Sequence, residues 1–576
     1  MLLGRLKLPA EIRTLNVEEL EILCDEIRQE IIAVSLRNGG HLGASLGAVE
    51  IAVALHRIFE SPKDKMIWDV GHQAYAHKLI TGRANRFSTL RKSGGISGFL
   101  SRAESEHDAF GAGHSSTALS AALGFAYRSD AWTLAVVGDG GLSAGVAFEA
   151  LNNIQSPNYF GPMIIILNDN QMSISENVGG LHHILENGQA AEYFQMFGLE
   201  YVGPMSGHDL PTLLATLNGI KAAKPTKPIL LHLLTQKGKG YSPAESQPAL
   251  YHGVGPAQSG PVDGKTKAPE EVAAERTWSD LFCDALLDQA AHDPKILGIT
   301  AAMADGTGLL PFAKKFPERF FDVGIAEAHG ATFAAGLAAN GWKPVCAIYS
   351  TFLQRAFDAI IHDIALQELP VIFGVDRAGL VGADGPTHHG VFDLAYGGMV
   401  PGLRIYTPEV GEDIEGSFQD ALGSGKPTFI RYPRGKASLK GDVTYAPLRG
   451  LDSVTPLSRQ LIVTFGPIGI RVRKIISSLS QDLQNTIAHV SVIQAKPIPE
   501  ALIQMLDQKA NQFDRVLYFE DGIHRGSLSV DLASRYPLIP AHYFDYPDIF
   551  LPHGTVPEIE QGYGFTDDAV RRVLQA

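Results

Sequence analysis

A glycine-rich turn with a carboxylate inside it is the sequence feature best suited to chemistry. The apolar run TLAVV at residues 133–137 leads into Gly138, Asp139, Gly140 and Gly141, and a helical pattern follows. A glycine turn between a strand and a helix is typical of phosphate binding, because backbone N–H groups and the positive helix end face the anion. A dinucleotide fold is one interpretation. Asp139 would repel a pyrophosphate unless a cation lay between them, which favours a metal-bridged diphosphate.

The next apolar run ends in residues that would complete such a metal site. MIIILND at residues 163–169 is followed by Asn170, Gln171 and Met172. One carboxylate from Asp139, the amide oxygen of Asn170 and a backbone carbonyl, joined by phosphate oxygens and water, form an octahedral oxygen shell suited to Mg²⁺. The glycine turn alone is a weak signal, whereas its pairing with a second polar strand end is much more specific.

Elements that could position these residues follow from the alternation of helical and strand-like patterns. Between residues 20 and 235 this alternation predicts a parallel α/β sheet, and residues 242–271, rich in Pro, Gly, Ser and charge, predict a linker. A second α/β run has strand candidates at 344–350, 369–376 and 428–432. After an irregular stretch at 436–456, the runs RQLIVTF, TIAHVSVI and VLYFED predict a third, smaller α/β unit.

Composition excludes several classes of function. A chain of 576 residues suggests about four compact units, or three larger ones. Its 48 Lys and Arg against 62 Asp and Glu give a net charge of −14, so we expect neither a nucleic-acid nor a membrane partner. The longest apolar runs are far too short to span a membrane. Its three widely spaced cysteines favour neither a disulfide framework nor a zinc site, which fits a reducing cytosol.

Several longer motifs identify a family. GGHLGASLGAVE, WDVGHQAYAHKLITG, GHSST, LNDNQMSISENVG, FDVGIAEAH, AIYSTFLQRAFD, DRAGLVGADGPTHHG and RYPRG together resemble the 1-deoxy-D-xylulose-5-phosphate synthases, a thiamine-diphosphate-dependent, transketolase-like family. The likeness is loose after about residue 455, and the stretch after Asn177, residues 178–198, is shorter than in the family. The resemblance implies three doubly wound α/β domains: 1–262 binding thiamine diphosphate and Mg²⁺, 277–438 binding the pyrimidine, and 455–576 at the carboxyl end.

The resemblance also implies roles for individual residues. Metal binding would fall to Asp139, Asn170 and the carbonyl of Met172. The cofactor would contact His72, Gly113, His114, Ser115, Gly140, Gly141, Asn170, Lys237, Tyr241 and Glu327. Catalysis would involve Glu327 and the histidines His41, His72, His252 and His388, and substrate would contact Tyr349, Arg355, Arg377, Asp384, His388 and Arg434.

Taken one at a time, these residues also have ordinary interpretations. Glu327 alone would be a first-turn glutamate favoured by the helix dipole, and the arginines alone would be solvated surface side chains. Within the family pattern, Glu327 would hydrogen-bond the aminopyrimidine ring so that thiamine loses its C2 proton. Arg377 and Arg434 would bind the phosphate of the acceptor substrate, because the N–H donors of a guanidinium match phosphate oxygens in pairs.

The implied reaction joins pyruvate, after loss of CO₂, to D-glyceraldehyde 3-phosphate and yields 1-deoxy-D-xylulose 5-phosphate. The resemblance implies a homodimer, and the cysteine usage favours a cytoplasmic location. Three alternatives stay open at this point: a transketolase-like enzyme with a ketose donor, a nicotinamide dehydrogenase built on the glycine turn, and a non-catalytic thiamine-binding protein.

Overall fold

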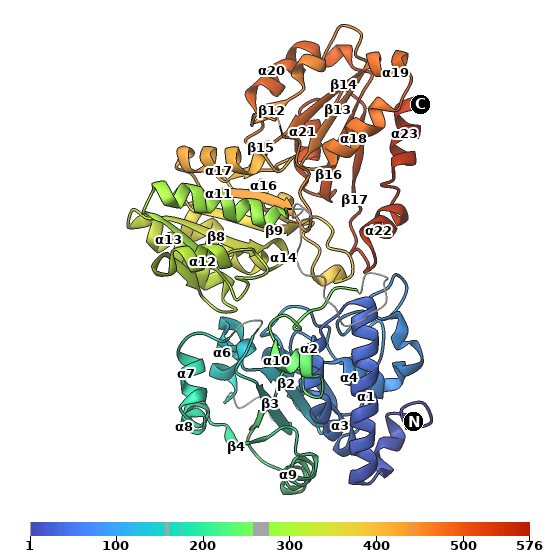
Figure 1. The fold of residues 1–576 in the computed structure, drawn as a ribbon, viewed down its shortest axis with the longest axis vertical. Helices are drawn as coiled ribbons and strands as arrows, with labels where there is room; N and C mark the ends of the chain where they lie inside the picture. The colour runs from blue at the N-terminus through green and yellow to red at the C-terminus, as the bar shows by residue number, and fades with distance from the viewer. Residues whose placement is uncertain (1, 156–160, 174–175, 257–275, 442) are drawn as a thin grey trace. The chain divides into compact units, whose positions relative to one another are not determined.

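A computed structural model describes residues 2–155, 161–173, 176–256, 276–441 and 443–576. The contacts within the chain divide it into two compact units. The first unit contains the described residues up to 256 together with the short segments 324–326 and 383–387, and the second contains the described remainder. The first unit holds one sheet and the second holds two (Figure 1).

The sheet of the first unit is parallel throughout. Its strands, in spatial order, are β1 (Lys65–Trp68), β2 (Thr133–Gly138), β3 (Met163–Asp169), β5 (Ile229–Leu234) and β4 (Glu200–Ser206). Its helices are α1 (Val17–Asn38), α2 (Leu42–Gly47), α3 (Val49–Ile58), α4 (Tyr75–Lys78), α5 (Ala118–Ala126), α6 (Gly145–Asn153), α7 (Gly180–Glu186), α8 (Ala190–Met196), α9 (Leu210–Ala223) and α10 (Ser242–Ser246).

Both faces of this sheet are covered, as the apolar strand sequences require. Leu134 and Val136 of β2 pack into one core with α1, α3 and α9. The alternate residues Ala135 and Val137 pack into a second core with α5, α6 and α8. Successive side chains on a strand point to opposite faces, so helices lie on both sides of the sheet (Figure 1).

The larger sheet of the second unit has one antiparallel strand at its edge. In order it contains β15 (Gln494–Lys496), β10 (Arg404–Tyr406), β11 (Thr428–Pro433), β9 (Ile372–Ala378), β8 (Lys343–Tyr349), β6 (Ile296–Thr300) and β7 (Phe320–Asp322). The helices in this part are α11 (Trp278–His292), α12 (Leu310–Lys315), α13 (Glu327–Ala339), α14 (Ser350–Leu353), α15 (Phe357–Ala359), α16 (Asp393–Met399) and α17 (Asp413–Ser424). Alternate residues again divide between two cores, with Cys346 and Ile348 of β8 on one face and Val345 and Ala347 on the other.

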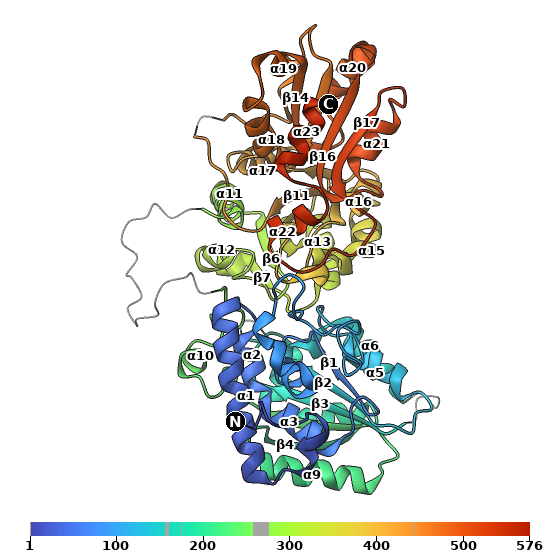
Figure 2. The same ribbon diagram turned by 90° about the vertical axis from the view of Figure 1, so that its right-hand side faces the viewer.

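The third sheet lies in the carboxyl-terminal part of the same unit (Figure 2). Its order is β12 (Leu448–Arg449), β14 (Ile487–Val492), β13 (Gln460–Phe465), β16 (Arg515–Ile523) and β17 (Ala541–Tyr546), with only β12 antiparallel. Its helices are α18 (Ile468–Ser477), α19 (Gln481–Thr486), α20 (Glu500–Lys509), α21 (Leu528–Ser534), α22 (Val556–Gly562) and α23 (Asp567–Gln575). A buried guanidinium, Arg431 of β11, joins the two sheets through Asp393 at 2.9 Å and Asp521 of β16 at 2.5 Å.

The predicted α/β fold with parallel sheets is confirmed, and each strand candidate coincides with an observed strand. Two local expectations need correction. The stretch 436–456, predicted to be irregular, contains β12, which pairs with β14. The predicted linker begins with α10, while its residues 257–271 lie outside the described part of the chain. In the described residues, no helix is both long and apolar enough to cross a membrane.

Candidate functional site

The glycine turn and the second polar strand end lie at one edge of the first sheet. Gly138 at the end of β2 is in register with Asn168 of β3, and the backbone N–H of Asp139 donates to the Asn168 carbonyl at 3.4 Å. After Asp139 the chain forms a short 3₁₀ turn, η4 (Gly140–Ser143), and then α6. The carboxyl ends of neighbouring parallel strands therefore bring the two motifs together.

The carboxylate of Asp139 has one satisfied oxygen and one unsatisfied oxygen. The side chain is buried, with the residue 3% exposed, and Oδ2 accepts a hydrogen bond from the amide of Asn177 at 2.7 Å. Among the described residues, the buried Oδ1 has no hydrogen-bond partner. Burial and the nearby carboxylate of Asp169 raise the pKa of Asp139 well above its usual value. A cation beside Oδ1 would satisfy that oxygen and stabilise the ionised form, so the residues present fit a bound metal.

The other two predicted metal ligands lie in the turn after β3. Oδ1 of Asn170 accepts from the backbone N–H of Met172 at 3.1 Å, and Gln171 between them has a positive φ of 62°. The turn leaves a second lone pair on the Asn170 oxygen and leaves the Met172 carbonyl as a further acceptor. In the described residues, no group of three or more His, Cys, Asp or Glu side chains could hold a metal. A metal site here would therefore need the amide oxygen of Asn170 and the carbonyl oxygen of Met172 in addition to the Asp139 carboxylate.

Gly140 and Gly141 lie so close to neighbouring side chains that a larger residue at either position would collide with them. A Cβ on Gly141 would lie 2.6 Å from Oδ2 of Asp69 and 3.3 Å from Oγ of Ser115. A Cβ on Gly140 would lie 3.0 Å from the side chains of Asn177 and Ser173. Without side chains, the turn can approach these neighbours closely, and a glycine turn at a strand end is suited to presenting backbone N–H groups to an anion.

Three predicted catalytic histidines form a triangle in the first unit. The ring centres lie 6.1 Å apart for His41 and His72, 5.5 Å for His72 and His252, and 5.9 Å for His41 and His252. Burial lowers the pKa of His72 to about 3, and burial together with the charge of Lys237 lowers the pKa of His252 well below its usual value. Both imidazoles are therefore neutral at pH 7 and can accept a proton or a hydrogen bond.

Lys237 contacts the chain directly after the predicted metal ligand Met172. Its ammonium donates to the carbonyl of Ser173 at 2.6 Å, in the turn that follows Met172. Burial lowers the pKa of Lys237 to about 8, against the opposing effect of Asp139. Tyr241 is only partly buried and packs with its ring centre 5.8 Å from that of Tyr251.

The loop before α5 brings Ser115 next to Gly141 of the glycine turn, and its residues Gly113 and His114 contact Thr387. His114 Nε2 donates to the carbonyl of Thr387 at 2.8 Å, and Gly113 has a φ of +152° where a Cβ would overlap Thr387. Oγ of Ser115 donates to Asp69 at 3.2 Å. Thr387 belongs to the segment 383–387, which is part of the first unit.

Asp384, predicted to bind substrate, lies in the same short segment. Its carboxylate forms an ion pair with Arg91 at 2.7 Å, again within the first unit. The structure thus places Asp384 with the predicted cofactor residues of that unit.

Glu327 begins α13 in the second unit and is 4% exposed. Its Oε2 lies 3.7 Å from the guanidinium of Arg355, another predicted substrate residue. Burial raises the pKa of the Glu327 carboxyl, and Arg355 opposes that rise. A carboxyl in this setting can hold a proton closer to neutral pH than an exposed glutamate can.

Three further predicted substrate residues are joined by ring contacts. The Arg377 guanidinium lies 4.1 Å from the ring centre of Tyr349, which stacks on Phe352 at 5.5 Å, and Phe352 meets His388 edge-on at 5.5 Å. Arg377 has a positive φ of 57°. Arg434 donates to the carbonyl of Val381 at 3.4 Å.

Sequence reasoning missed three residues that support these groups. Asp69 accepts hydrogen bonds from the backbone N–H groups of Ser116 at 2.8 Å and Ala118 at 3.2 Å, and so holds the loop before α5. Asn177 binds Asp139, and Phe352 links Tyr349 to His388. All three belong to the family motifs quoted above. Asp69 could have been found from the sequence, because it is a polar residue directly after a strand.

Comparison with known proteins shows which family this chain belongs to. The family model described as 1-deoxy-D-xylulose-5-phosphate synthase matches residues 3–193 and 188–235, and that of the transketolase pyrimidine binding domain matches residues 274–439. A 1-deoxy-D-xylulose-5-phosphate synthase of Myxococcus xanthus is 44% identical over 585 residues, covering 97% of this chain and 96% of that protein. The chain belongs to the 1-deoxy-D-xylulose-5-phosphate synthase family.

Other members of this family match over a similar extent. The protein named 1-deoxy-D-xylulose-5-phosphate synthase 2 of Geobacter sulfurreducens is 40% identical, covering 99% of this chain and 98% of its own. The Thermus thermophilus synthase is also 40% identical, covering 100% and 98%. The first family model matches in two segments that overlap at residues 188–193, inside the stretch expected to be short. Membership in the synthase family argues against a nicotinamide dehydrogenase.

Proposed function

We propose that this protein decarboxylates pyruvate and transfers the remaining two-carbon unit to D-glyceraldehyde 3-phosphate, giving 1-deoxy-D-xylulose 5-phosphate and CO₂. The observation that carries this proposal is the relationship, over almost the whole chain, to proteins named for that product. Thiamine diphosphate is the cofactor, and when bound it supplies a ring that stabilises the carbanion and carries the two-carbon unit.

The metal and diphosphate are assigned to the first unit. Asp139, Asn170 and the carbonyl of Met172 would hold Mg²⁺, and the unpartnered oxygen of Asp139 supports this assignment. The remaining diphosphate contacts would come from the backbone of Gly140 and Gly141, and from Gly113, His114, Ser115, Lys237 and Tyr241.

The reaction needs groups that hold and move protons. Glu327 would donate a hydrogen bond to the pyrimidine ring or accept one from it, and its buried position keeps water from competing. The neutral imidazoles of His72 and His252, with His41 and His388, would receive or deliver protons near the reacting carbon. Substrate would be bound by Tyr349, Arg355, Arg377, Asp384 and Arg434.

The chain organisation is part of the same proposal. Residues 1–262 would form the diphosphate domain, 277–438 the pyrimidine domain and 455–576 the carboxyl-terminal domain, in a cytoplasmic homodimer. Analytical ultracentrifugation would measure the oligomeric state directly, and a monomer active at the same specific rate would contradict the dimer.

A steady-state assay tests the reaction itself. With thiamine diphosphate and Mg²⁺, we expect CO₂ release from pyruvate that depends on D-glyceraldehyde 3-phosphate, and formation of the pentulose phosphate. Omitting the cofactor should abolish both. Turnover with a ketose phosphate donor but not with pyruvate would support the transketolase-like alternative, and cofactor binding without turnover would support a non-catalytic protein.

We expect Asp139→Asn and Asn170→Ala to weaken binding of Mg²⁺ together with thiamine diphosphate by at least about tenfold, because each impairs one oxygen ligand of an ion with strict geometry. Isothermal titration at several Mg²⁺ concentrations measures the loss, and excess Mg²⁺ should partly restore activity. Gln171→Ala, at the position between the predicted ligands Asn170 and Met172, is the matched control. Unchanged dissociation constants in both variants would contradict the metal assignment.

The pKa of Lys237 predicts a pH dependence for cofactor binding. The free protein loses the Lys237 charge as pH rises through about 8, whereas a bound diphosphate favours the charged form. The dissociation constant should therefore rise by about tenfold per pH unit above that value. Lys237→Arg should flatten the profile, since arginine stays charged. A flat wild-type profile between pH 7 and 10 would show that Lys237 does not contact the diphosphate.

A further inference from the structure

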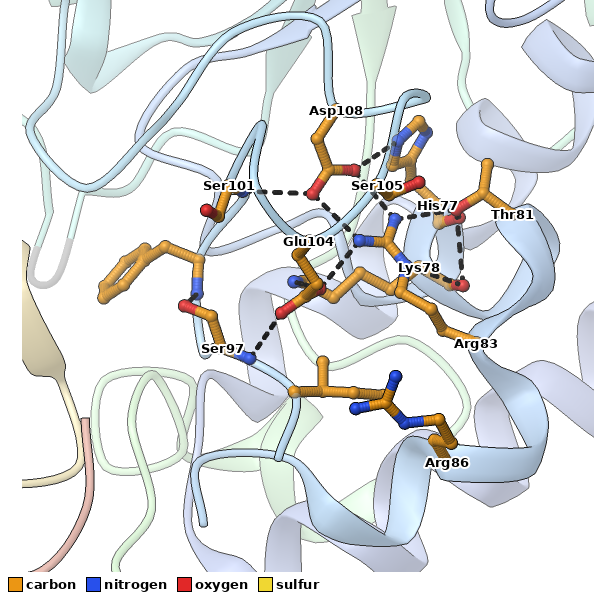
Figure 3. A network of polar contacts seen from close by, with 12 residues as sticks. His77, Lys78, Thr81, Arg83, Arg86, Ser97, Ser101, Glu104, Ser105 and Asp108 are labelled. Carbon is orange, nitrogen blue, oxygen red and sulfur yellow. Dashed lines mark hydrogen bonds and ion pairs between the residues drawn. The ribbon is translucent and has the colours of Figure 1, made fainter. Parts of the chain in front are cut away.

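A buried network of charged groups joins residues 77–83 to the loop that contains Ser97, Glu104 and Asp108 (Figure 3). Arg83 contacts Asp108 through two guanidinium nitrogens, each at 2.8 Å, and contacts Glu104 at 2.7 Å. Glu104 also accepts from the ammonium of Lys78 at 2.5 Å, and Asp108 accepts from Nε2 of His77 at 3.3 Å. The side chains of Asp108, Lys78 and His77 are 0% exposed. None of these residues is used in the proposed reaction.

The basic side of the network belongs to one helical segment. His77 and Lys78 end α4, and Arg83 ends the following turn η2 (Leu79–Arg83). Gly82, with a φ of +84°, reverses the chain just before Arg83. Thr81 accepts from Arg83 at 2.7 Å and donates to the His77 carbonyl at 2.6 Å, which fixes the guanidinium.

The acidic side belongs to a loop with no regular structure of its own. Residues 90–117, all of them described, contain no helix or strand. Glu104 accepts from the backbone N–H of Ser97 at 2.7 Å, and Asp108 accepts from that of Ser101 at 3.0 Å. Each carboxylate therefore joins the loop backbone to the helical segment, and Arg83 holds both carboxylates.

This loop reaches the predicted site at two points. Between the two anchored N–H groups, the ring of Phe99 lies 5.0 Å from that of His41 in the histidine triangle. At the far end, Ala112 donates to the carbonyl of Leu100 at 3.2 Å, and Gly113 follows immediately. From Gly113 the chain continues to His114 and Ser115, beside the glycine turn.

We propose that Arg83, through Asp108 and Glu104, is a positioning residue that holds the loop 97–108 so that Gly113–Ser115 and His41 keep the geometry needed for cofactor binding. This inference rests on the proposed function. Buried, fully hydrogen-bonded networks orient neighbouring groups, and here the network supplies the order that an irregular loop lacks.

Binding experiments that need no turnover test the inference. The dissociation constant of thiamine diphosphate with Mg²⁺ is measured by titration calorimetry for wild type, Arg83→Lys, Arg83→Met, Asp108→Asn and Glu104→Gln. We expect Asp108→Asn and Arg83→Met to raise it by about tenfold to hundredfold. Arg83→Lys should give an intermediate value, because an ammonium keeps the charge but cannot contact both carboxylates as a planar fork. Glu104→Gln keeps an acceptor and is the variant least prone to unfold.

Asp413→Asn is the matched control for lost stability. Asp413 is likewise a buried carboxylate that binds an arginine, Arg449, and two backbone N–H groups, but it touches no residue of the loop. We expect its melting temperature to fall as in Asp108→Asn, with the cofactor dissociation constant within about twofold of wild type. Hydrogen exchange should accelerate at residues 97–117 in the Arg83 variants and not in this control.

The outcomes separate the two proposals. No binding of thiamine diphosphate by the wild type would overturn the proposed function and this inference with it. Normal wild-type binding that is unchanged in Asp108→Asn and Glu104→Gln, or that weakens equally in Asp413→Asn, would overturn only the positioning role.

Discussion

Glu327→Gln should leave cofactor binding nearly intact and lower kcat by roughly 10²- to 10⁴-fold, the contribution expected of a positioned proton-transfer group. The amide has the shape of the carboxyl and can keep a hydrogen bond, but it cannot exchange a proton. The side chain is 4% exposed, so water is poorly placed to replace it. An interaction needed in activation more than in binding lowers kcat and kcat/KM together.

Three measurements separate this role from a loss of stability. The cofactor dissociation constant and the melting temperature should stay near the wild-type values, while exchange of the thiamine C2 proton, followed by NMR, should slow with kcat. Glu520→Gln is the matched control, because Glu520 is a buried glutamate of the same unit whose pKa burial raises to about 7. Near-normal exchange of the C2 proton in Glu327→Gln would contradict the role of Glu327 in activating the cofactor.

Arg377→Ala and Arg434→Ala should each raise the KM for D-glyceraldehyde 3-phosphate strongly. A charge-assisted hydrogen bond to phosphate contributes about 1.5–3 kcal/mol, which corresponds to roughly tenfold to hundredfold in affinity. Arg434→Lys should recover only part of the loss, because an ammonium lacks the planar fork. The KM for pyruvate, which has no phosphate, should hardly change.

Two controls accompany the arginine variants. Unphosphorylated D-glyceraldehyde should be used about equally poorly by wild type and variants. Arg319→Ala removes another arginine of the same unit that stacks on a ring, that of Phe316 at 3.8 Å, and should leave both KM values unchanged. If the variants lost pyruvate binding, or still discriminated against the unphosphorylated acceptor as wild type does, these arginines would be structural.

Local sequence patterns were enough to predict the sheets and one edge of the site. Continuous apolar runs such as MIIILND form buried parallel strands because both faces must be covered. The carboxyl ends of adjacent parallel strands share one edge, so Asp139 and Asn170 could be placed together from the sequence alone. Glycine at 140 and 141 likewise follows from the turn that such an edge requires.

Tertiary packing decided which distant residues meet. His41, His72 and His252 form their triangle although five strands and α9 lie between His41 and His252 in the chain. The segment 383–387 joins the first unit, where Asp384 meets Arg91, and β15 adds to a sheet otherwise built from earlier residues.

Burial, too, was visible only in the structure. The unpartnered oxygen of Asp139 and the enclosed network around Arg83 depend on which side chains exclude water at each point. Hydrophobic periodicity indicates which face of a helix or strand is buried. It does not indicate which other helix or strand packs against that face. Contacts between residues far apart in sequence are set by the packing of whole elements, and charge and hydrogen-bond geometry at the site follow from that packing.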